Sequence, residues 1–123
     1  MIHLDTNYVV AAVAPDTEAA QQLAAWMRSG ELFEISVLVW SEFLCGPLTP
    51  AERAAATVLF PQVVPFSQDA ASLAAELFNV AGRRRGSMID CMIAATAIDA
   101  GAALATFNTN DFQRFVGSGL TLL

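Results

Sequence analysis

Residues 1–13 read Met-Ile-His-Leu-Asp-Thr-Asn-Tyr-Val-Val-Ala-Ala-Val, and this stretch decides the fold. Residues 1–4 form a short apolar segment, which predicts a strand that stops at Asp5. A helical stretch follows at once from Thr6 to Val13, and Pro15 breaks it. A strand that leads directly into a helix is typical of α/β folds, in which the two kinds of element alternate.

The same alternation continues along the rest of the chain. Apolar and β-branched runs predict further strands at residues 33–39, 63–66, 102–106 and 120–123. Helices are predicted between them: one capped by Asp16 that runs to Arg28 before Gly30, one that starts within 41–44 and ends at Gly46-Pro47, one entered at Thr49-Pro50, one capped by Ser67, one from Gly86-Ser87 through Ala100, and a short one from Asp111. With no repeat and no long polar linker, the sequence predicts a single domain over residues 1–123.

The predicted strands are continuous apolar runs, which are typical of parallel strands buried on both faces. Right-handed crossovers then restrict the fold to a three-layer α/β/α sandwich with a mostly parallel central sheet of four to five strands. In such sheets the functional crevice lies beyond the carboxyl ends of the strands. Acids that follow a strand are therefore the first candidates for chemistry.

Composition limits the possible functions. The 123 residues carry a net charge of −6, are 55% hydrophobic and include no lysine. The missing lysine excludes phosphate-loop ATPases, and it argues against aspartate phosphoacceptors such as receiver or haloacid-dehalogenase-like domains. The negative charge argues against nucleic-acid binding unless bound metal ions reverse the local field. The apolar excess indicates surface that is reserved for a partner.

Nothing in the sequence indicates export or a membrane span. No apolar run approaches the roughly 20 residues that cross a bilayer, and the first residues lack the basic start of a secretion signal. Cys45 and Cys91 have no metal-ligand spacing and are expected to be free thiols. We therefore expect a cytoplasmic protein that does not bind membranes.

Four acids stand where this fold would place chemistry: Asp5, Glu42, Asp90 and Asp111. Asp5 directly follows the first predicted strand, and Glu42 follows the second within an apolar segment. Asp90 lies near the start of the most apolar helix, where a buried carboxylate without a partner is costly and neither lysine nor histidine is available. Asp111 follows the fourth predicted strand. Asp99 falls nine residues after Asp90, about 180° around the helix, and should face away.

Each candidate acid also has a structural explanation that the sequence leaves open. Asp5 and Asp111 are well placed as helix N-caps, and Glu42 as a first-turn acid that complements a helix dipole. Asn108, three residues before Asp111, is placed to add an amide oxygen or to orient a bound water.

Carboxylates without histidine or cysteine form an oxygen-only site, which suits Mg²⁺ or Mn²⁺ and disfavours zinc. Such a site suits in-line displacement at a phosphodiester, because a bound metal lowers the pKa of a water molecule and stabilises charge on the phosphate oxygens. Before metal binds, mutual repulsion is expected to raise the pKa of at least one of these carboxyl groups.

The segments that carry the four acids resemble those of PIN-domain proteins, specifically the VapC-type toxins of bacterial toxin–antitoxin pairs. The matching segments are residues 4–7 (Leu-Asp-Thr-Asn), 41–46 (Ser-Glu-Phe-Leu-Cys-Gly), Gly86 with 89–97 (Ile-Asp-Cys-Met-Ile-Ala-Ala-Thr-Ala) and 106–112 (Thr-Phe-Asn-Thr-Asn-Asp-Phe). No single segment is specific, but four in this order are, and they cover nearly the whole chain.

The resemblance implies a Mg²⁺- or Mn²⁺-dependent endoribonuclease that a VapB-like antitoxin inhibits, with homodimers and toxin–antitoxin hetero-oligomers as the expected assemblies. It implies that Asp5, Glu42 and Asp90 are the core metal ligands and catalytic residues. Asp111 is the fourth acid, and we expect it to coordinate indirectly. Some relatives have a further acid where this chain has Asn108, so the resemblance leaves the number of metal ions open.

Polar and basic residues near the acids are candidates for holding the substrate. Thr6 and Asn7 match the polar pair after the first acid, and they are expected to hydrogen-bond a ligand carboxylate or the scissile phosphate. Arg83, Arg84 and Arg85 precede Gly86; they suit phosphate binding, and they equally suit an exposed helix C-terminus.

Two other functions remain open at this point. The first is a PIN-domain nuclease in RNA processing or in flap-type DNA cleavage. The second is a non-catalytic binding module that has kept the fold. The intact acids at all four motif positions argue against the second, and the minimal length favours a toxin over the first.

Overall fold

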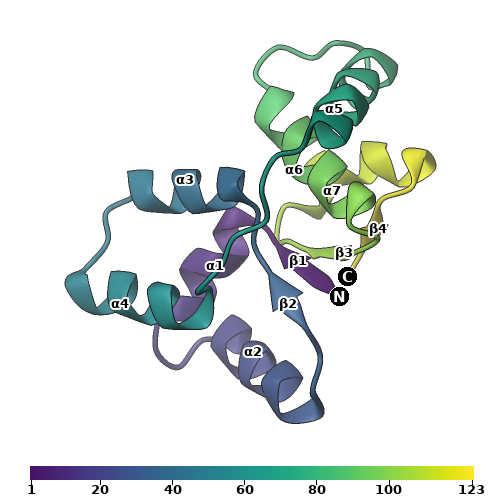
Figure 1. Cartoon of the computed structure of the whole chain (residues 1–123). Coiled ribbons are helices and arrows are strands. Elements are labelled where there is room, and N and C mark those ends of the chain that lie inside the picture. Colours follow the sequence, from purple (N-terminus) through teal and green to yellow (C-terminus); the bar gives the residue numbers. More distant parts are fainter.

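The computed structural model describes residues 1–123 and shows a parallel sheet with helices packed around it (Figure 1). The strands are β1 (Ile2–Leu4), β2 (Phe33–Glu34), β3 (Ala103–Ala105) and β4 (Thr121–Leu122), in the spatial order β2-β1-β3-β4. All three pairings are parallel, and Leu4 at the end of β1 lies beside Ala105 at the end of β3. The α/β/α fold and the parallel sheet are therefore confirmed, with four strands.

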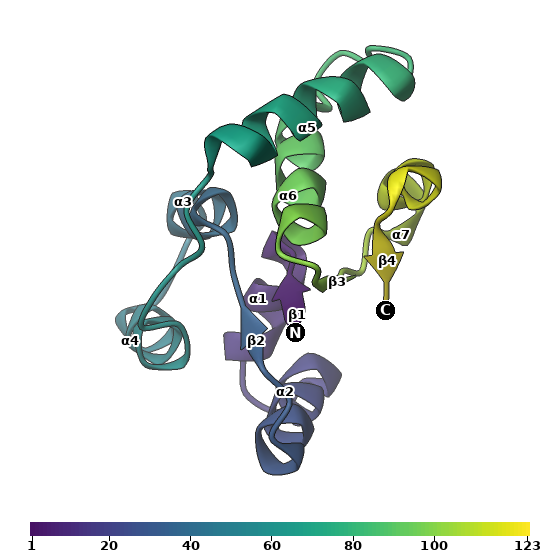
Figure 2. The ribbon, with the colours of Figure 1, turned by 45° about the vertical axis from the view of Figure 1, so that its right-hand side comes forward.

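Seven α-helices surround the sheet. They are α1 (Thr6–Val13), α2 (Glu18–Ser29), α3 (Val37–Cys45), α4 (Pro50–Leu59), α5 (Gln68–Val80), α6 (Met88–Asp99) and α7 (Thr109–Phe112), which continues into the 3₁₀ helix η1 (Gln113–Ser118). Helix α1 contacts α2, α3 and α4 on the side of β2, whereas α5 and α6 pack against each other on the other side of the molecule (Figure 1). Figure 2 shows α6 between α5 and the sheet.

Helix α6 is the buried centre of its layer. Cys91 and the run from Ile93 to Ala97 are buried, and Ala94, Ala95 and Ala97 have no exposed surface. These small side chains allow α6 to approach the sheet closely, since protein interiors are packed at crystal-like density. The helix that is apolar on nearly all sides in the sequence is thus buried on nearly all sides in the fold.

Hydroxyl side chains begin most of the helices, as expected for N-caps. Thr49 accepts a hydrogen bond from the backbone N–H of Glu52, and Ser67 accepts one from Ala70. The predicted starts of α4 and α5 are confirmed. The cap of α2 is Thr17 and not Asp16, because Asp16 occupies a left-handed turn with φ of 64° and Thr17 accepts from the backbone N–H of Ala20.

Two predicted strands are wrong in extent. Residues 33–39 form a strand only over Phe33–Glu34, because Ser36 caps a helix that already begins at Val37. The cap and the tertiary contacts of α3 here outweigh the β propensity of Val37 and Val39. Residues 63–66 form a single parallel bridge, in which Val64 exchanges two 2.8 Å backbone hydrogen bonds with Ile35 and Val37.

Smaller differences concern the end of the chain. Strand β3 ends at Ala105 and β4 at Leu122, each shorter than predicted, and α7 begins at Thr109, so that Asp111 lies inside its first turn. Cys45 and Cys91 are both free thiols, as predicted. No helix is long and apolar enough to cross a membrane.

Candidate active site

Asp5 lies at the carboxyl end of β1 and is only 6% exposed. Its Oδ1 accepts a 2.8 Å hydrogen bond from the backbone N–H of Thr6, so it also caps α1. Its Oδ2 accepts a 2.7 Å hydrogen bond from the Thr106 hydroxyl. Burial raises the pKa of Asp5, and these two hydrogen bonds oppose the rise. The cap does not exclude a ligand role, because each carboxylate oxygen has two lone pairs.

Glu42 reaches the same place from α3. Its Oε1 accepts a 2.7 Å hydrogen bond from the Thr6 hydroxyl, across 36 residues of sequence. Because α3 begins at Val37, Glu42 is not in the first turn, and the dipole explanation of this residue is wrong. Glu42 is also exposed, so the expected cost of burying it does not apply. What remains is a carboxylate that Thr6 holds near Asp5.

Asp90 lies in the first turn of α6, and its carboxyl group is affected by the charges of the other three acids. Burial raises its pKa, and the charges of Asp5, Asp111 and Glu42 raise it further, while the Arg114 guanidinium opposes them. The expected rise in a carboxyl pKa is therefore found at Asp90, with burial as its largest cause and repulsion as an addition. Asp5, Glu42 and Asp111 are thus each close enough to Asp90 for their charges to affect it.

Asp111 is partly exposed, with 38% of its side-chain surface accessible. Its Oδ2 accepts a 2.9 Å hydrogen bond from the Asn108 amide, and its Oδ1 lies 3.5 Å from Nη1 of Arg84. The Asn108 hydrogen bond and the positive charges of Arg84 and Arg114 lower the pKa of Asp111. Asn108 therefore contacts the fourth acid directly through its amide N–H, which is neither of its two expected roles, and those roles stay predictions.

Two functional candidates were missed from the sequence, and the first is Thr106. Its hydroxyl donates to Asp5 and accepts a 2.9 Å hydrogen bond from the backbone N–H of Asn108. It therefore links the buried acid to the segment that carries Asp111. The signal was available, since Thr106 directly follows β3 just as Asp5 directly follows β1.

The second missed residue is Arg114 in η1. Its Nη2 lies 3.7 Å from Oδ2 of Asp90, and its guanidinium lies 4.7 Å from the ring centroid of Phe115. The side chain is 19% exposed, and its Nε is buried without a hydrogen-bond partner. The sequence argument considered only lysine and histidine as partners of Asp90 and overlooked this arginine. The spacing of three residues from Asp111 on a helical segment was the available signal.

The other predicted residues divide between the site and its surroundings. Asn7 accepts a 3.3 Å hydrogen bond from the backbone N–H of Phe107, beside the acids. In the arginine triplet only Arg84 contacts a site acid. Arg83 donates to Asn79 and stacks on Phe78, and no salt bridge involves Arg85. Asp99 faces away as expected and accepts a hydrogen bond from Ser67.

The donor set fits a hard divalent cation, because it consists of carboxylate oxygens with Asn and Thr oxygens nearby. No three His, Cys, Asp or Glu side chains are close enough together to hold an ion as they stand. Binding one would require the acids to move toward each other. Asp111 and Asp90 instead contact Arg84 and Arg114.

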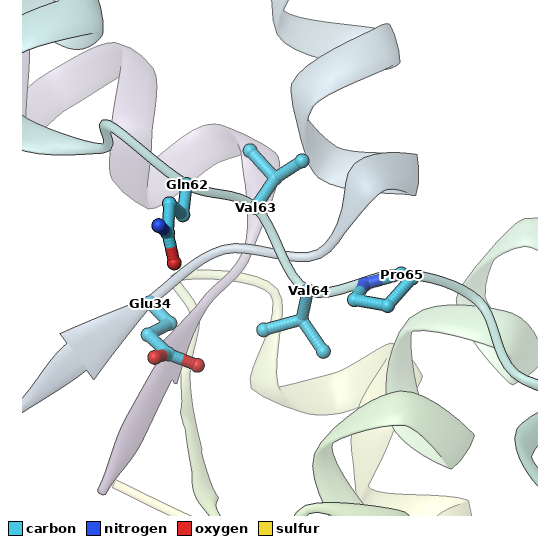
Figure 3. A pocket seen from close by; sticks show the side chains of 5 residues that line it. All are labelled: Glu34, Gln62, Val63, Val64 and Pro65. Atoms are coloured by element: carbon cyan, nitrogen blue, oxygen red, sulfur yellow. The ribbon is translucent and has the colours of Figure 1, made fainter.

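A hollow of about 240 Å³ lies elsewhere, beside β2, and is lined by Glu34, Gln62, Val63, Val64 and Pro65 (Figure 3). It contains none of the four acids. Glu34 is its only titratable side chain, so it offers no pair of groups for acid–base chemistry or metal binding.

Comparisons with solved structures find the same fold in toxin–antitoxin proteins. The structure of VapBC2 from Rickettsia felis bound to a promoter DNA fragment superposes with a TM-score of 0.78 at 22% identity, over 100% of this chain and 98% of that one. FitAcB from Neisseria gonorrhoeae gives a TM-score of 0.73 at 22% identity, over 100% and 96%. A toxin–antitoxin complex from Klebsiella pneumoniae gives 0.72 at 29% identity, over 91% and 90%. The comparison with curated proteins gave no match.

The comparison with family models is decisive for the family. The model described as "PIN domain" matches residues 2–117, which include all four acids as well as Thr106 and Arg114. The chain belongs to the PIN domain family.

Proposed function

We propose that this protein is a Mg²⁺-dependent endoribonuclease and the toxin of a VapBC-type toxin–antitoxin pair. PIN domains are generally nucleases, and the solved structures similar to this chain come from toxin–antitoxin complexes. The observation that carries the proposal is the convergence of Asp5, Glu42, Asp90 and Asp111, which makes Asp90 sensitive to the other three. Mn²⁺ is a possible substitute for Mg²⁺.

Asp5, Glu42 and Asp90 would hold the metal, with Asp111 as a helper that acts from the exposed side. The bound ion would lower the pKa of a water molecule and stabilise negative charge on the phosphate. Thr6 and Thr106 fix the orientation of Glu42 and Asp5 by hydrogen bonds. Arg84 and Arg114 already contact the acids, so their guanidinium groups are placed to pair with a phosphate that enters the site.

The partners follow from the same proposal. The substrate is RNA, the regulator is a VapB-like antitoxin, and the assemblies are a homodimer and a toxin–antitoxin hetero-oligomer. Exposed apolar side chains on several elements supply surface for such contacts, among them Met27, Leu32, Val58 and Val80. We place the protein in the cytoplasm, where its RNA substrate would be.

The test compares two variants of the same helix. Asp90→Asn should reduce Mg²⁺-dependent cleavage of RNA by about 10³-fold or more while the protein stays folded, since it removes charge that acts in the transition state. Asp99→Asn removes an identical charge from the other side of α6 and should leave cleavage unchanged. Undiminished cleavage by Asp90→Asn would contradict the proposal.

Induced expression in a bacterium, followed by mapping of RNA 5′ ends, would test toxicity and identify the target together. Growth arrest that is relieved by Asp90→Asn and by co-expression of an antitoxin supports the toxin assignment. Cleavage restricted to DNA flaps, or to a precursor RNA without growth arrest, would instead support a PIN nuclease in nucleic-acid processing.

A further inference from the structure

Three aromatic rings form a stack that ends beside the acids. Trp26 and Tyr8 have ring centroids 5.9 Å apart at an interplanar angle of 23°, and Tyr8 and Phe107 have centroids 4.9 Å apart at 15°. Tyr8 is buried, whereas Phe107 is 57% exposed. The stack therefore runs from α2 through α1 to an open aromatic surface at the end of β3.

The position of Phe107 is fixed by the site itself. It lies between Thr106, which donates to Asp5, and Asn108, which donates to Asp111. Its own backbone N–H donates to Asn7, and its ring rests on Tyr8. An exposed phenylalanine is usually mobile, but this one is held from the backbone and from one face of the ring.

We propose that Phe107 is a stacking platform for an unpaired base of the substrate next to the scissile phosphate. This inference rests on the proposed nuclease function. Single-stranded nucleic acids are held by aromatic rings on which bases stack, combined with positive charge along the backbone. Phe107 supplies the ring, and Arg84 and Arg114 supply the charge within the same site. A base inside a duplex is already stacked on both faces, so the platform selects a single-stranded segment.

The nearest phenylalanines along the chain, Phe112 and Phe115, are fully buried and belong to the core. Phe107 differs because its ring is open to solvent at the one place where a phosphodiester would bind.

The experiment uses four variants of the full chain. Phe107→Ala removes the ring, Phe107→Leu keeps apolar bulk without a ring, and Phe107→Tyr keeps the ring. Leu123→Ala, at an apolar residue that follows β4 and is 58% exposed, is the control for loss of apolar surface. With single-stranded RNA as the substrate, Phe107→Ala and Phe107→Leu should each raise KM by about 5- to 100-fold. Phe107→Tyr and the control variant should change KM little. The turnover number should change less than KM.

Binding is measured separately with short RNA strands that carry 2-aminopurine at one position each, because stacking quenches its fluorescence. The wild type should quench the probe at one position, and Phe107→Ala and Phe107→Leu should not. If the wild type cleaves no RNA but still shows this quenching, the nuclease proposal fails and the stacking proposal stands. Unchanged KM and quenching in Phe107→Ala, or full function in Phe107→Leu, would overturn it. A change only in self-association, measured by light scattering, would make Phe107 an interface residue and would also overturn it.

Discussion

Asp5 and Asp111 both follow a strand of the central pair, β1 and β3, yet their surroundings are opposite. Asp5 is buried, accepts hydrogen bonds on both oxygens from residues fixed in the fold, and has a raised pKa. Asp111 is partly exposed, pairs with Asn108 and with the exposed side chain of Arg84, and has a lowered pKa. The difference indicates a site with one rigid side, set by the core, and one adjustable side, set at the surface.

Adding Mg²⁺ should reveal the largest difference between the rigid and the adjustable side of the site. At a concentration of about 100 times its Kd, an ion that binds only the folded protein raises the free energy of unfolding by about 2.7 kcal/mol. Asp5→Asn should abolish most of this gain, and Asp111→Asn should keep most of it. Thermal unfolding with Mg²⁺ and with EDTA measures both, and an equal loss in the two variants would remove the distinction between the two sides.

Thr106→Val tests the rigid side alone. The variant leaves the buried Oδ2 of Asp5 and the backbone N–H of Asn108 without the hydrogen bonds that the Thr106 hydroxyl makes. The free energy of unfolding should fall by about 1–3 kcal/mol, and cleavage should fall about 10- to 100-fold because Asp5 is no longer oriented. Thr106→Ser keeps the hydroxyl and should recover both properties in urea unfolding and in cleavage assays. Failure of Ser to recover either would assign the effect to packing.

The two arginines offer a smaller comparison within the cluster. Arg114 is mostly buried against Asp90 and Phe115, whereas Arg84 is largely exposed beside Asp111. In the absence of metal, Arg114→Gln should lower the free energy of unfolding by about 1 kcal/mol, and Arg84→Gln by about 0.3 kcal/mol or less. Double-mutant cycles that combine Arg114→Gln with Asp90→Asn, and Arg84→Gln with Asp111→Asn, measure the coupling free energy of each ion pair. A larger coupling free energy for the Arg84–Asp111 pair would reverse the assignment of the rigid and the adjustable side.

Much of the fold could be predicted because the local signals agree with the tertiary structure. Pro15, Gly30 and Ser67 mark helix boundaries by backbone chemistry that no distant contact needs to change. The strand of residues 33–39 was too long because its apolar pattern does not distinguish a strand from a buried helix. The hydrogen bond from the Val39 backbone N–H to Ser36 and the tertiary contacts of α3 together decide that the helix begins at Val37.

The candidate site likewise contains some residues that could be predicted from the sequence and others that could not. Asp5 could be predicted from its position after a strand, and Asp90 from its apolar setting. Thr106 and Arg114 act through neighbours that are distant in sequence, since 101 residues separate Thr106 from Asp5. The exposure of Glu42 depends on where α3 begins, which the sequence does not show. The apolar segment around Glu42 is therefore the wrong reason for selecting this residue. The metal and the substrate stay predictions.

Helix α6 carries Asp90 at one end and has three fully buried alanines along its length. An added methyl group at such a position has no space, and overpacking of a core usually costs about 1–3 kcal/mol and shifts the backbone. Because Asp90 moves with α6, a change of core volume about one to two turns away would also change the spacing of the acids. Substitutions inside this helix are therefore not silent for activity, and on the proposed toxin function variants such as Ala95→Val should arise among the inactive variants in selections for survival.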